Sequence, residues 1–240
     1  MSERLANIVR GMEPVTATAS LHVEVIADFV CPFCFLGKRR LDEALQAVQG
    51  PSDVSWYPFQ LNPEIEPEGM AFEDYLVSRF GSLENIEPVL EHLTAEGKEE
   101  GVAFAFDKIR HVPNTLPVHQ VMQSVETLGA DQSALADDLM SSFFEQGVNI
   151  GERDVLIEIA GRHGVAAQDV RNALGSDEVR QLVLTREAQV RSSGLTSAPG
   201  FLVNRRLLLV GAQPTANIVN AFDRAMFGEG TDSLVSPALH

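Results

Sequence analysis

The order of hydrophobic segments predicts a mixed α/β fold, in which a small sheet is interrupted by a block of helices. Residues 21–60 contain two apolar runs of strand length on either side of a helical pattern. Residues 201–227 contain two further runs and a last helix. Between these segments lie roughly a hundred residues in which apolar side chains recur at helical spacing.

The first segment is expected to fold as strand, helix, strand. An almost continuous apolar run at residues 21–29 predicts the first strand. Within residues 41–48, apolar side chains recur at i, i+3, i+4 and i+7, which predicts a helix with these side chains on its inner face. A second strand is expected at residues 54–59, after the break at residues 50–53. Residues 1–20 show no clear periodicity and are expected to form an arm.

The central block is expected to be mainly helical, because four groups of apolar side chains each fall on one face of a helix. These groups are Val118, Val121, Met122 and Val125; Leu135, Leu139 and Phe143; Val155, Leu156 and Ile159; and Val179, Leu182, Val183 and Val190.

A hairpin and a final helix are expected near the end of the chain. Two apolar strands, at residues 201–203 and 207–210, flank the polar turn formed by residues 204–206, although this turn lacks a glycine. Residues 211–214 are expected to start the last helix, and the ending after residue 228 is expected to be a loose tail.

The only two cysteines of the chain lie two residues apart in Cys31-Pro32-Phe33-Cys34, where the first strand gives way to the first helix. A helix N-terminus has unpaired N–H groups and favours an anion, here a thiolate. The spacing therefore indicates a dithiol–disulfide pair, with buried structural cysteines as one alternative. Half of a zinc site is another, but none of the six histidines forms a pair at ligand spacing, so no metal is expected.

Composition describes a globular chain of 240 residues with a formal charge of −16. This charge argues against nucleic acid as a partner, because the phosphates would be repelled. No apolar run approaches the roughly 20 residues that cross a bilayer, and residues 1–20 lack the apolar core of a signal peptide. A cytoplasmic protein is therefore expected, in a compartment where disulfides are usually transient or catalytic.

Four ordered sequence blocks resemble the DsbA family of thioredoxin-fold proteins, and within it the FrnE-like branch. The blocks are residues 28–41, which contain the cysteines, residues 57–63, residues 114–119 and residues 211–214. The resemblance implies a thioredoxin-like fold with a large inserted helical domain. Its implied limits are an N-terminal arm at 1–20, a discontinuous thioredoxin-like domain at 21–62 and 193–228, an inserted domain at 63–192, and a C-terminal tail at 229–240.

The resemblance also implies a thiol–disulfide oxidoreductase that acts through a mixed disulfide on Cys31. Cys31 matches the exposed nucleophile and Cys34 the resolving cysteine, with Pro32 and Phe33 in the active-site loop. Pro199 matches a cis-proline that faces the cysteines, and the backbone of Ala198 would bind substrate. Partners would be thiol- or disulfide-containing proteins or small thiols. No cofactor is implied beyond the redox-active disulfide, with glutathione as a reductant; the oligomeric state is left open, a homodimer included.

Three positions depart from the family pattern. Gly200 replaces a bulky residue, which predicts a more open substrate groove, and Phe33 replaces the histidine of the most oxidising relatives. Val25 stands where many thioredoxin-fold enzymes bury a carboxylate. Strand alternation points Asp28 and Glu24 away from the side of Val25, so slow resolution by Cys34 is expected at neutral pH.

Other side chains were expected to be structural. His119 is interpreted as a helix cap, and Lys38, Arg39 and Arg40 as a solvated helix face. Two other classes of function stay open. One is a glutathione-dependent transferase or isomerase of the kappa or hydroxychromene-carboxylate type, which shares the architecture but typically carries serine at the first cysteine position. The other is a non-catalytic binding or chaperone module.

Overall fold

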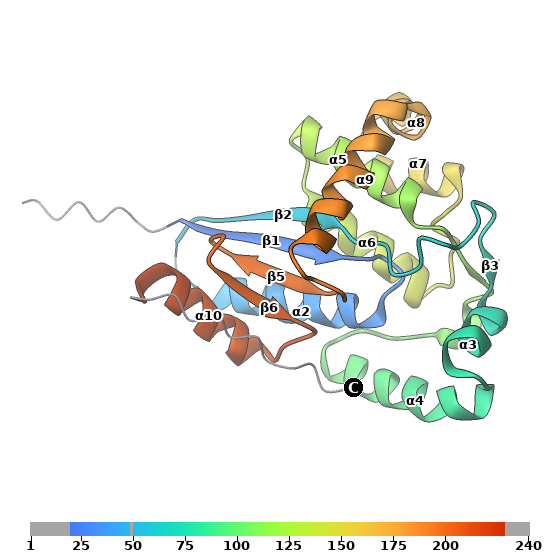
Figure 1. Cartoon of the computed structure of the whole chain (residues 1–240), viewed down its shortest axis with the longest axis horizontal. Helices are drawn as coiled ribbons and strands as arrows, with labels where there is room; N and C mark the ends of the chain where they lie inside the picture. Colours follow the sequence, from blue (N-terminus) through green and yellow to red (C-terminus); the bar gives the residue numbers. More distant parts are fainter. Residues whose placement is uncertain (1–19, 49, 229–240) are drawn as a thin grey trace, which may run out of the picture.

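A four-stranded mixed sheet forms the centre of the computed structural model, which describes residues 20–48 and 50–228 (Figure 1). Its strands follow the order β2-β1-β5-β6, with β1 parallel to β2 and the β5 strand antiparallel to both β1 and β6. The strands are β1 (Leu21–Ala27), β2 (Ser52–Pro58), β5 (Gly200–Val203) and β6 (Leu207–Val210). The expected sheet from two distant segments is confirmed, whereas residues 1–19 of the arm and the tail at 229–240 lie outside the described residues.

Helices α2 (Pro32–Ala47) and α10 (Thr215–Phe227) pack against each other below the sheet (Figure 1). The chain between β2 and β5 forms the helical insertion, in which α6 and α9 contact β2. Its elements are β3 (Met70–Ala71), α3 (Phe72–Phe80), α4 (Leu83–Glu99), a 3-10 turn (Phe106–Lys108), β4 (His111–Val112), α5 (Leu116–Leu128), α6 (Gln132–Phe144), α7 (Arg153–Arg162), α8 (Ala167–Gly175) and α9 (Asp177–Ser192). No helix among the described residues is long and apolar enough to cross a membrane.

Most expected elements are confirmed, with shifted ends. Strand β1 ends at Ala27 rather than at residue 29, and the last helix begins at Thr215 after Pro214. The hairpin turn has positive φ angles of 48° and 54° at Asn204 and Arg205. No glycine is needed there, because asparagine tolerates a positive φ angle and Asn204 makes two hydrogen bonds to His22. The backbone N–H of Asn204 donates to the carbonyl oxygen of His22, and its side-chain oxygen accepts the backbone N–H of His22, at 2.8 Å each.

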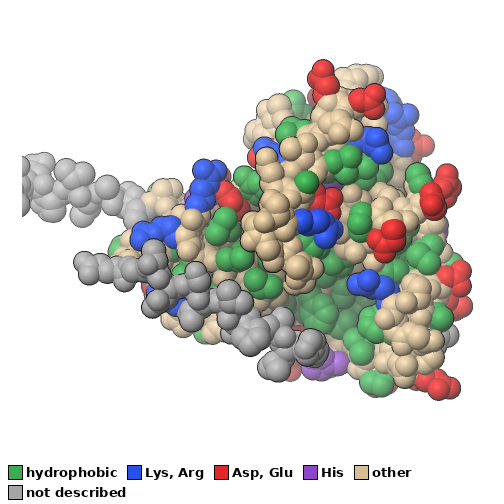
Figure 2. All heavy atoms as spheres, viewed as in Figure 1, with side chains coloured by type: hydrophobic (Ala, Val, Ile, Leu, Met, Phe, Trp, Pro, Cys, Tyr) green, Lys and Arg blue, Asp and Glu red, His purple; other side chains and the backbone are tan. Residues whose placement is uncertain are grey.

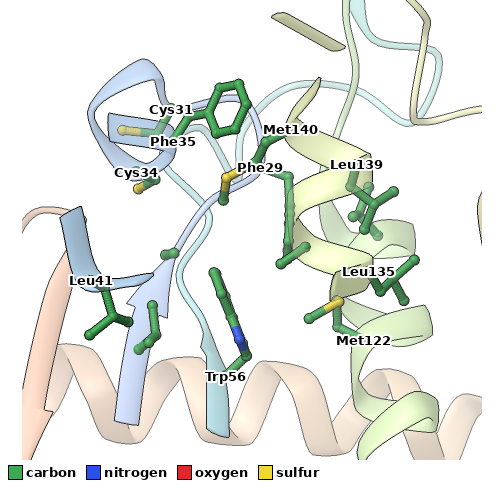
Figure 3. Packing of buried hydrophobic residues seen from close by; sticks show 14 of the residues in the cluster. Phe29, Cys31, Cys34, Phe35, Leu41, Trp56, Met122, Leu135, Leu139 and Met140 are labelled. Carbon is green, nitrogen blue, oxygen red and sulfur yellow. The ribbon is translucent and has the colours of Figure 1, made fainter. Parts of the chain in front are cut away.

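One hydrophobic core runs from the sheet into the inserted helices and includes both cysteines (Figure 3). Phe35, one residue after Cys34, is fully buried. Its ring lies 6.1 Å from the ring centroids of both Phe104 and Phe144. The first turn of α2 is therefore packed directly against the insertion.

The basic segment of α2 is not a solvated face. Lys38 and Arg40 are buried, and each pairs with acidic side chains from other parts of the chain. Arg40 contacts Glu96 of α4 at 2.7 Å and Glu100, the residue after this helix, at 2.6 Å, while Lys38 and Arg39 both contact Asp137 of α6. The expectation is wrong because these acidic partners come from the insertion, far away in the sequence.

The opposite face of the sheet is only partly covered. A hollow of about 330 Å³ lies on this face. It is bordered by Ile26, Leu202 and Leu208 of the sheet and by Val190 of α9. Figure 2 shows hydrophobic side chains over the sheet on this face, and acidic side chains along the edge formed by the inserted helices.

Candidate active site

The two cysteines lie at the N-terminus of α2, as predicted. Cys31 is the N-cap residue, with an extended backbone at φ −99° and ψ 113°, and Pro32 is the first residue of the helix. The carbonyl oxygen of Cys31 accepts a hydrogen bond from the backbone N–H of Cys34 at 3.0 Å. Both thiols are free, and Figure 3 shows the two labelled cysteines next to each other at the start of α2.

The expected exposure of Cys31 is wrong. The Cys31 side chain is only 3% exposed and that of Cys34 only 2%, whereas Phe33 between them is 44% exposed. Cys31 is covered because its Sγ atom faces the backbone carbonyl of Ala198, at 3.9 Å. The buried Cys31 thiol therefore lies between the exposed Phe33 loop residue and the loop that contains Ala198.

The peptide bond between Ala198 and Pro199 is cis, which confirms the prediction. The carbonyl oxygen of Pro199 accepts the backbone N–H of Gly211 at 2.8 Å, which ties the loop to the end of β6. The loop also lies close to α2, since a Cβ atom added to Gly37 would lie 3.1 Å from the Pro199 ring and 3.0 Å from the Phe201 ring. Glycine at position 37 thus lets the cysteine helix approach the proline loop.

The expected opening at Gly200 is filled. A Cβ atom at this position would lie 3.0 Å from the side chain of Leu195, which is itself buried. Leu195 therefore occupies the space that a bulkier residue would take, and the groove is not widened there.

The environment of Cys34 strongly disfavours its thiolate. Burial is the largest cause that raises the pKa of Cys34 well above the ordinary thiol value, and the neighbouring Cys31 thiol raises it further. The backbone N–H of Asp28, 3.5 Å from Cys34 Sγ, acts in the opposite direction and lowers this pKa. The Asp28 carboxylate raises it again by charge repulsion.

This raised pKa predicts how the stability of the reduced protein depends on pH. The unfolded chain loses the Cys34 proton at a lower pH than the folded chain, so the contribution of Cys34 is complete below pH 9.0 and is lost as the pH rises above that value. The free energy of unfolding of reduced wild type should fall more steeply above this pH than that of Cys34→Ala. Urea unfolding at neutral and alkaline pH measures this difference, and parallel pH profiles would contradict it.

Asp28 and His119 are two site residues whose position the sequence reasoning missed. Asp28 lies beyond the end of β1, so strand alternation does not apply to it, and its side chain is fully buried. His119 is not a helix cap; it lies inside α5, where its ring packs on Phe29 with centroids 5.2 Å apart. Its Nε2 atom is 3.6 Å from Asp28 Oδ1. The block containing His119 was recognised, but no local pattern shows that its ring meets Asp28.

Tyr75 of α3 also belongs to this neighbourhood. Burial is the main cause that raises the pKa of its hydroxyl, and the charges of Cys31 and Asp28 raise it further. The insertion thus contributes at least Tyr75 and His119 to the surroundings of the cysteines. Within the described parts of the chain, no group of three or more His, Cys, Asp or Glu side chains could hold a metal ion.

Comparison with known proteins finds one family model over almost the whole described chain. The model describes a DSBA-like thioredoxin domain and matches residues 22–223. The uncharacterized protein YwbO of Bacillus subtilis is 24% identical over 217 residues, which cover 88% of this chain and 98% of that protein.

Two solved structures share the fold. A probable DsbA oxidoreductase from Streptomyces coelicolor has a TM-score of 0.79 and 26% identity, over 91% of this chain and 94% of the other. The cytosolic disulfide reductase DsbM from Pseudomonas aeruginosa, solved with GSH, has a TM-score of 0.55 and 18% identity, over 85% and 95% of the two chains. At this identity, the second likeness concerns the fold alone.

Proposed function

This chain belongs to the family of DSBA-like thioredoxin domains, and from that premise we propose that it is a thiol–disulfide oxidoreductase with Cys31 and Cys34 as its redox pair. One observation carries the proposal: two free cysteines lie together at a helix N-terminus, beside the cis-proline loop. Neighbouring thiols can form a disulfide with little movement, and the helix N-terminus favours a thiolate at the first of them.

In the reducing direction, the Cys31 thiolate attacks a substrate disulfide, forms a mixed disulfide, and expels one substrate thiolate. The sulfur of Cys34 then attacks Cys31 and expels the second thiolate, so the protein becomes the disulfide and the substrate the dithiol. In the oxidising direction the same bonds are exchanged in reverse. A substrate thiolate attacks Cys31 of the disulfide, and a second substrate thiol resolves the adduct.

The proposal extends to the groups around the pair. Pro32 and Phe33 form the active-site loop, and the exposed ring of Phe33 offers apolar contact to a partner. The backbone of Ala198, before Pro199, would pair with an extended substrate segment. We place the thioredoxin-like domain at residues 21–62 and 193–228 and the inserted domain at 63–192, as the sequence indicates.

Partners are proposed to be proteins or small thiols in a cytoplasmic setting, where glutathione would serve as a reductant. The FrnE-like branch is part of this proposal, on the four sequence blocks described above. The pair needs no cofactor for the exchange, because the electrons are carried by the cysteines themselves.

Reduction of insulin with dithiothreitol as electron donor tests the proposal. Wild type should accelerate the precipitation of insulin chains, and the Cys31→Ser, Cys34→Ser double variant should not exceed the uncatalysed rate. Equal rates for the two proteins would overturn the proposal.

The glutathione-dependent alternative makes a separate prediction. Such an enzyme would conjugate glutathione to a chromogenic electrophile, and Cys34 would not be needed for that reaction. Conjugation that persists in Cys34→Ser, together with no insulin reduction by wild type, would favour the transferase class over the oxidoreductase.

A further inference from the structure

Asp28 touches the reacting sulfur of Cys34 through its backbone while its carboxylate is held rigidly in the interior. Oδ1 accepts the backbone N–H of Phe29 at 2.8 Å, and Oδ2 accepts that of Leu61 at 2.7 Å. The carboxylate is fully buried, and these two bonds fix its orientation. Each oxygen keeps one further lone pair that these bonds do not use.

The Nε2 atom of His119 faces this carboxylate without a hydrogen-bond partner. This atom is buried and lies 3.6 Å from Asp28 Oδ1. A buried polar atom without a partner is costly, so an unpaired one calls for an explanation. The aromatic ring of Phe29 packs against the imidazole at a tilt of 58°.

A proton placed between Asp28 Oδ1 and His119 Nε2 would give the unpaired Nε2 atom a hydrogen-bond partner. With Nε2 unprotonated, two lone pairs face each other across 3.6 Å. One proton between them forms a hydrogen bond that is charge-assisted or neutral, depending on which atom holds the proton. The pair can therefore hold a proton inside the core, and the backbone N–H of Asp28 contacts the thiol that has to lose one.

We propose that the Asp28–His119 pair accepts the proton of Cys34 when Cys34 resolves a mixed disulfide on Cys31, with His119 as the positioning residue. The inference rests on the proposed exchange function. The Cys34 thiol gives its proton to the pair, and the freed sulfur electron pair forms the bond to Cys31 Sγ. The bond between Cys31 and the substrate sulfur breaks, and the substrate leaves as a thiolate. The two cysteines are oxidised to the disulfide and the substrate is reduced.

Charge balance favours this route. A thiolate formed near an ionised Asp28 would place two negative charges in the interior, and this repulsion adds to burial, the largest cause of the raised pKa of Cys34. Transfer of the proton to the pair leaves the total charge of the site unchanged. Two other titratable groups interact with this site: Cys31, the N-cap of α2, and Tyr75 of α3, whose hydroxyl pKa is also raised mainly by burial.

Asp28 takes the role of the carboxylate that many thioredoxin-fold enzymes carry at the position of Val25. Val25 is buried in β1, opposite Trp56 of β2 and Phe201 of β5. An acid at that position would lie in an apolar layer. Asp28, three residues later and beyond the end of the strand, supplies the carboxylate instead, and His119 reaches it from the insertion.

Two-step kinetics with a chromogenic aromatic disulfide test the inference. Reduced protein should release one aromatic thiolate when Cys31 attacks, and a second when Cys34 resolves the adduct. Asp28→Asn should leave the first phase unchanged and slow the second about 100-fold at neutral pH, the typical size of a lost general base. His119→Gln should slow it less. Both variants should approach the wild-type rate at alkaline pH, where hydroxide removes the proton.

Matched controls separate this role from a structural one. Glu24→Gln changes a buried carboxylate of β1 that pairs with Arg205, and His163→Gln changes the histidine of another His–Asp pair, 3.1 Å from Asp138. Neither should alter the second phase or its pH profile. The inference would be overturned if the second phase of both Asp28→Asn and His119→Gln were as fast as that of wild type. A slowing that is independent of pH would also overturn it.

The outcomes remain informative if one variant does not fold. Unchanged first-phase rates show that the site is intact, and His119→Gln decides alone if Asp28→Asn is unfolded. Loss of the first phase in wild type would instead refute the proposed exchange function, so the two failures are distinguishable.

Discussion

Replacement of Cys31 by serine should lower the rate of disulfide exchange by about a factor of 1,000 or more, because the nucleophile of the cycle is removed. Cys34→Ser should behave differently. Its Cys31 can still attack a disulfide, but the mixed disulfide has no internal thiol to resolve it, so the adduct accumulates. Mass spectrometry after incubation with a disulfide substrate measures the adduct on each variant.

The structure supports this division of roles by position. Cys31 is the N-cap of α2, next to the Ala198 carbonyl at the substrate loop. Cys34 lies one turn inside and is bonded to the backbone of Asp28. Two results would show that the roles are reversed. One is an adduct on Cys34 in the Cys31→Ser variant. The other is faster alkylation of Cys34 than of Cys31 by iodoacetamide in reduced wild type.

Replacement of Phe35 by alanine should destabilise the protein by about 3–5 kcal/mol, the usual cost of removing a buried aromatic ring. This is a large share of the roughly 5–15 kcal/mol that stabilises a typical domain. The ring is fully buried between Phe104 and Phe144, and the Arg39 guanidinium lies 5.0 Å from its centroid. Its loss would open a cavity where the cysteine helix meets the insertion.

Phe33→Ala is the matched control, because the same change is made two residues earlier at an exposed ring. It should change the free energy of unfolding by no more than about 0.5 kcal/mol. Urea unfolding can be followed through Trp56, the only tryptophan of the chain, which is buried against Phe29. Equal losses in the two variants would contradict the packing described here.

The sheet and the cysteine helix could be predicted because their signals are local. The apolar runs at residues 21–29 and 201–210 have strand length, and Cys31-Pro32-Phe33-Cys34 lies between a strand and a helical pattern. The order of the elements predicted one mixed sheet from these two segments, and the structure adds that β1 pairs with β5. The cis bond before Pro199 was implied by the family resemblance rather than by any local pattern.

The surroundings of the cysteines could not be predicted, because they depend on contacts between distant segments. Asp28 appeared to alternate with Val25 only because the strand was expected to run two residues too far. Lys38 and Arg40 resemble surface residues until α4 and α6 bring acidic partners to them. His119 has no local feature that reveals the carboxylate it faces.

The central claim, that Cys31 and Cys34 form a reversible redox pair, is tested most directly by equilibrating the protein in glutathione buffers of graded potential. The fraction of Cys31–Cys34 disulfide is then measured by mass spectrometry after acid quenching. We expect a single transition in which the protein loses two hydrogen atoms and forms the internal disulfide. A protein that stays a dithiol throughout, or that accumulates only a stable glutathione adduct, would contradict it.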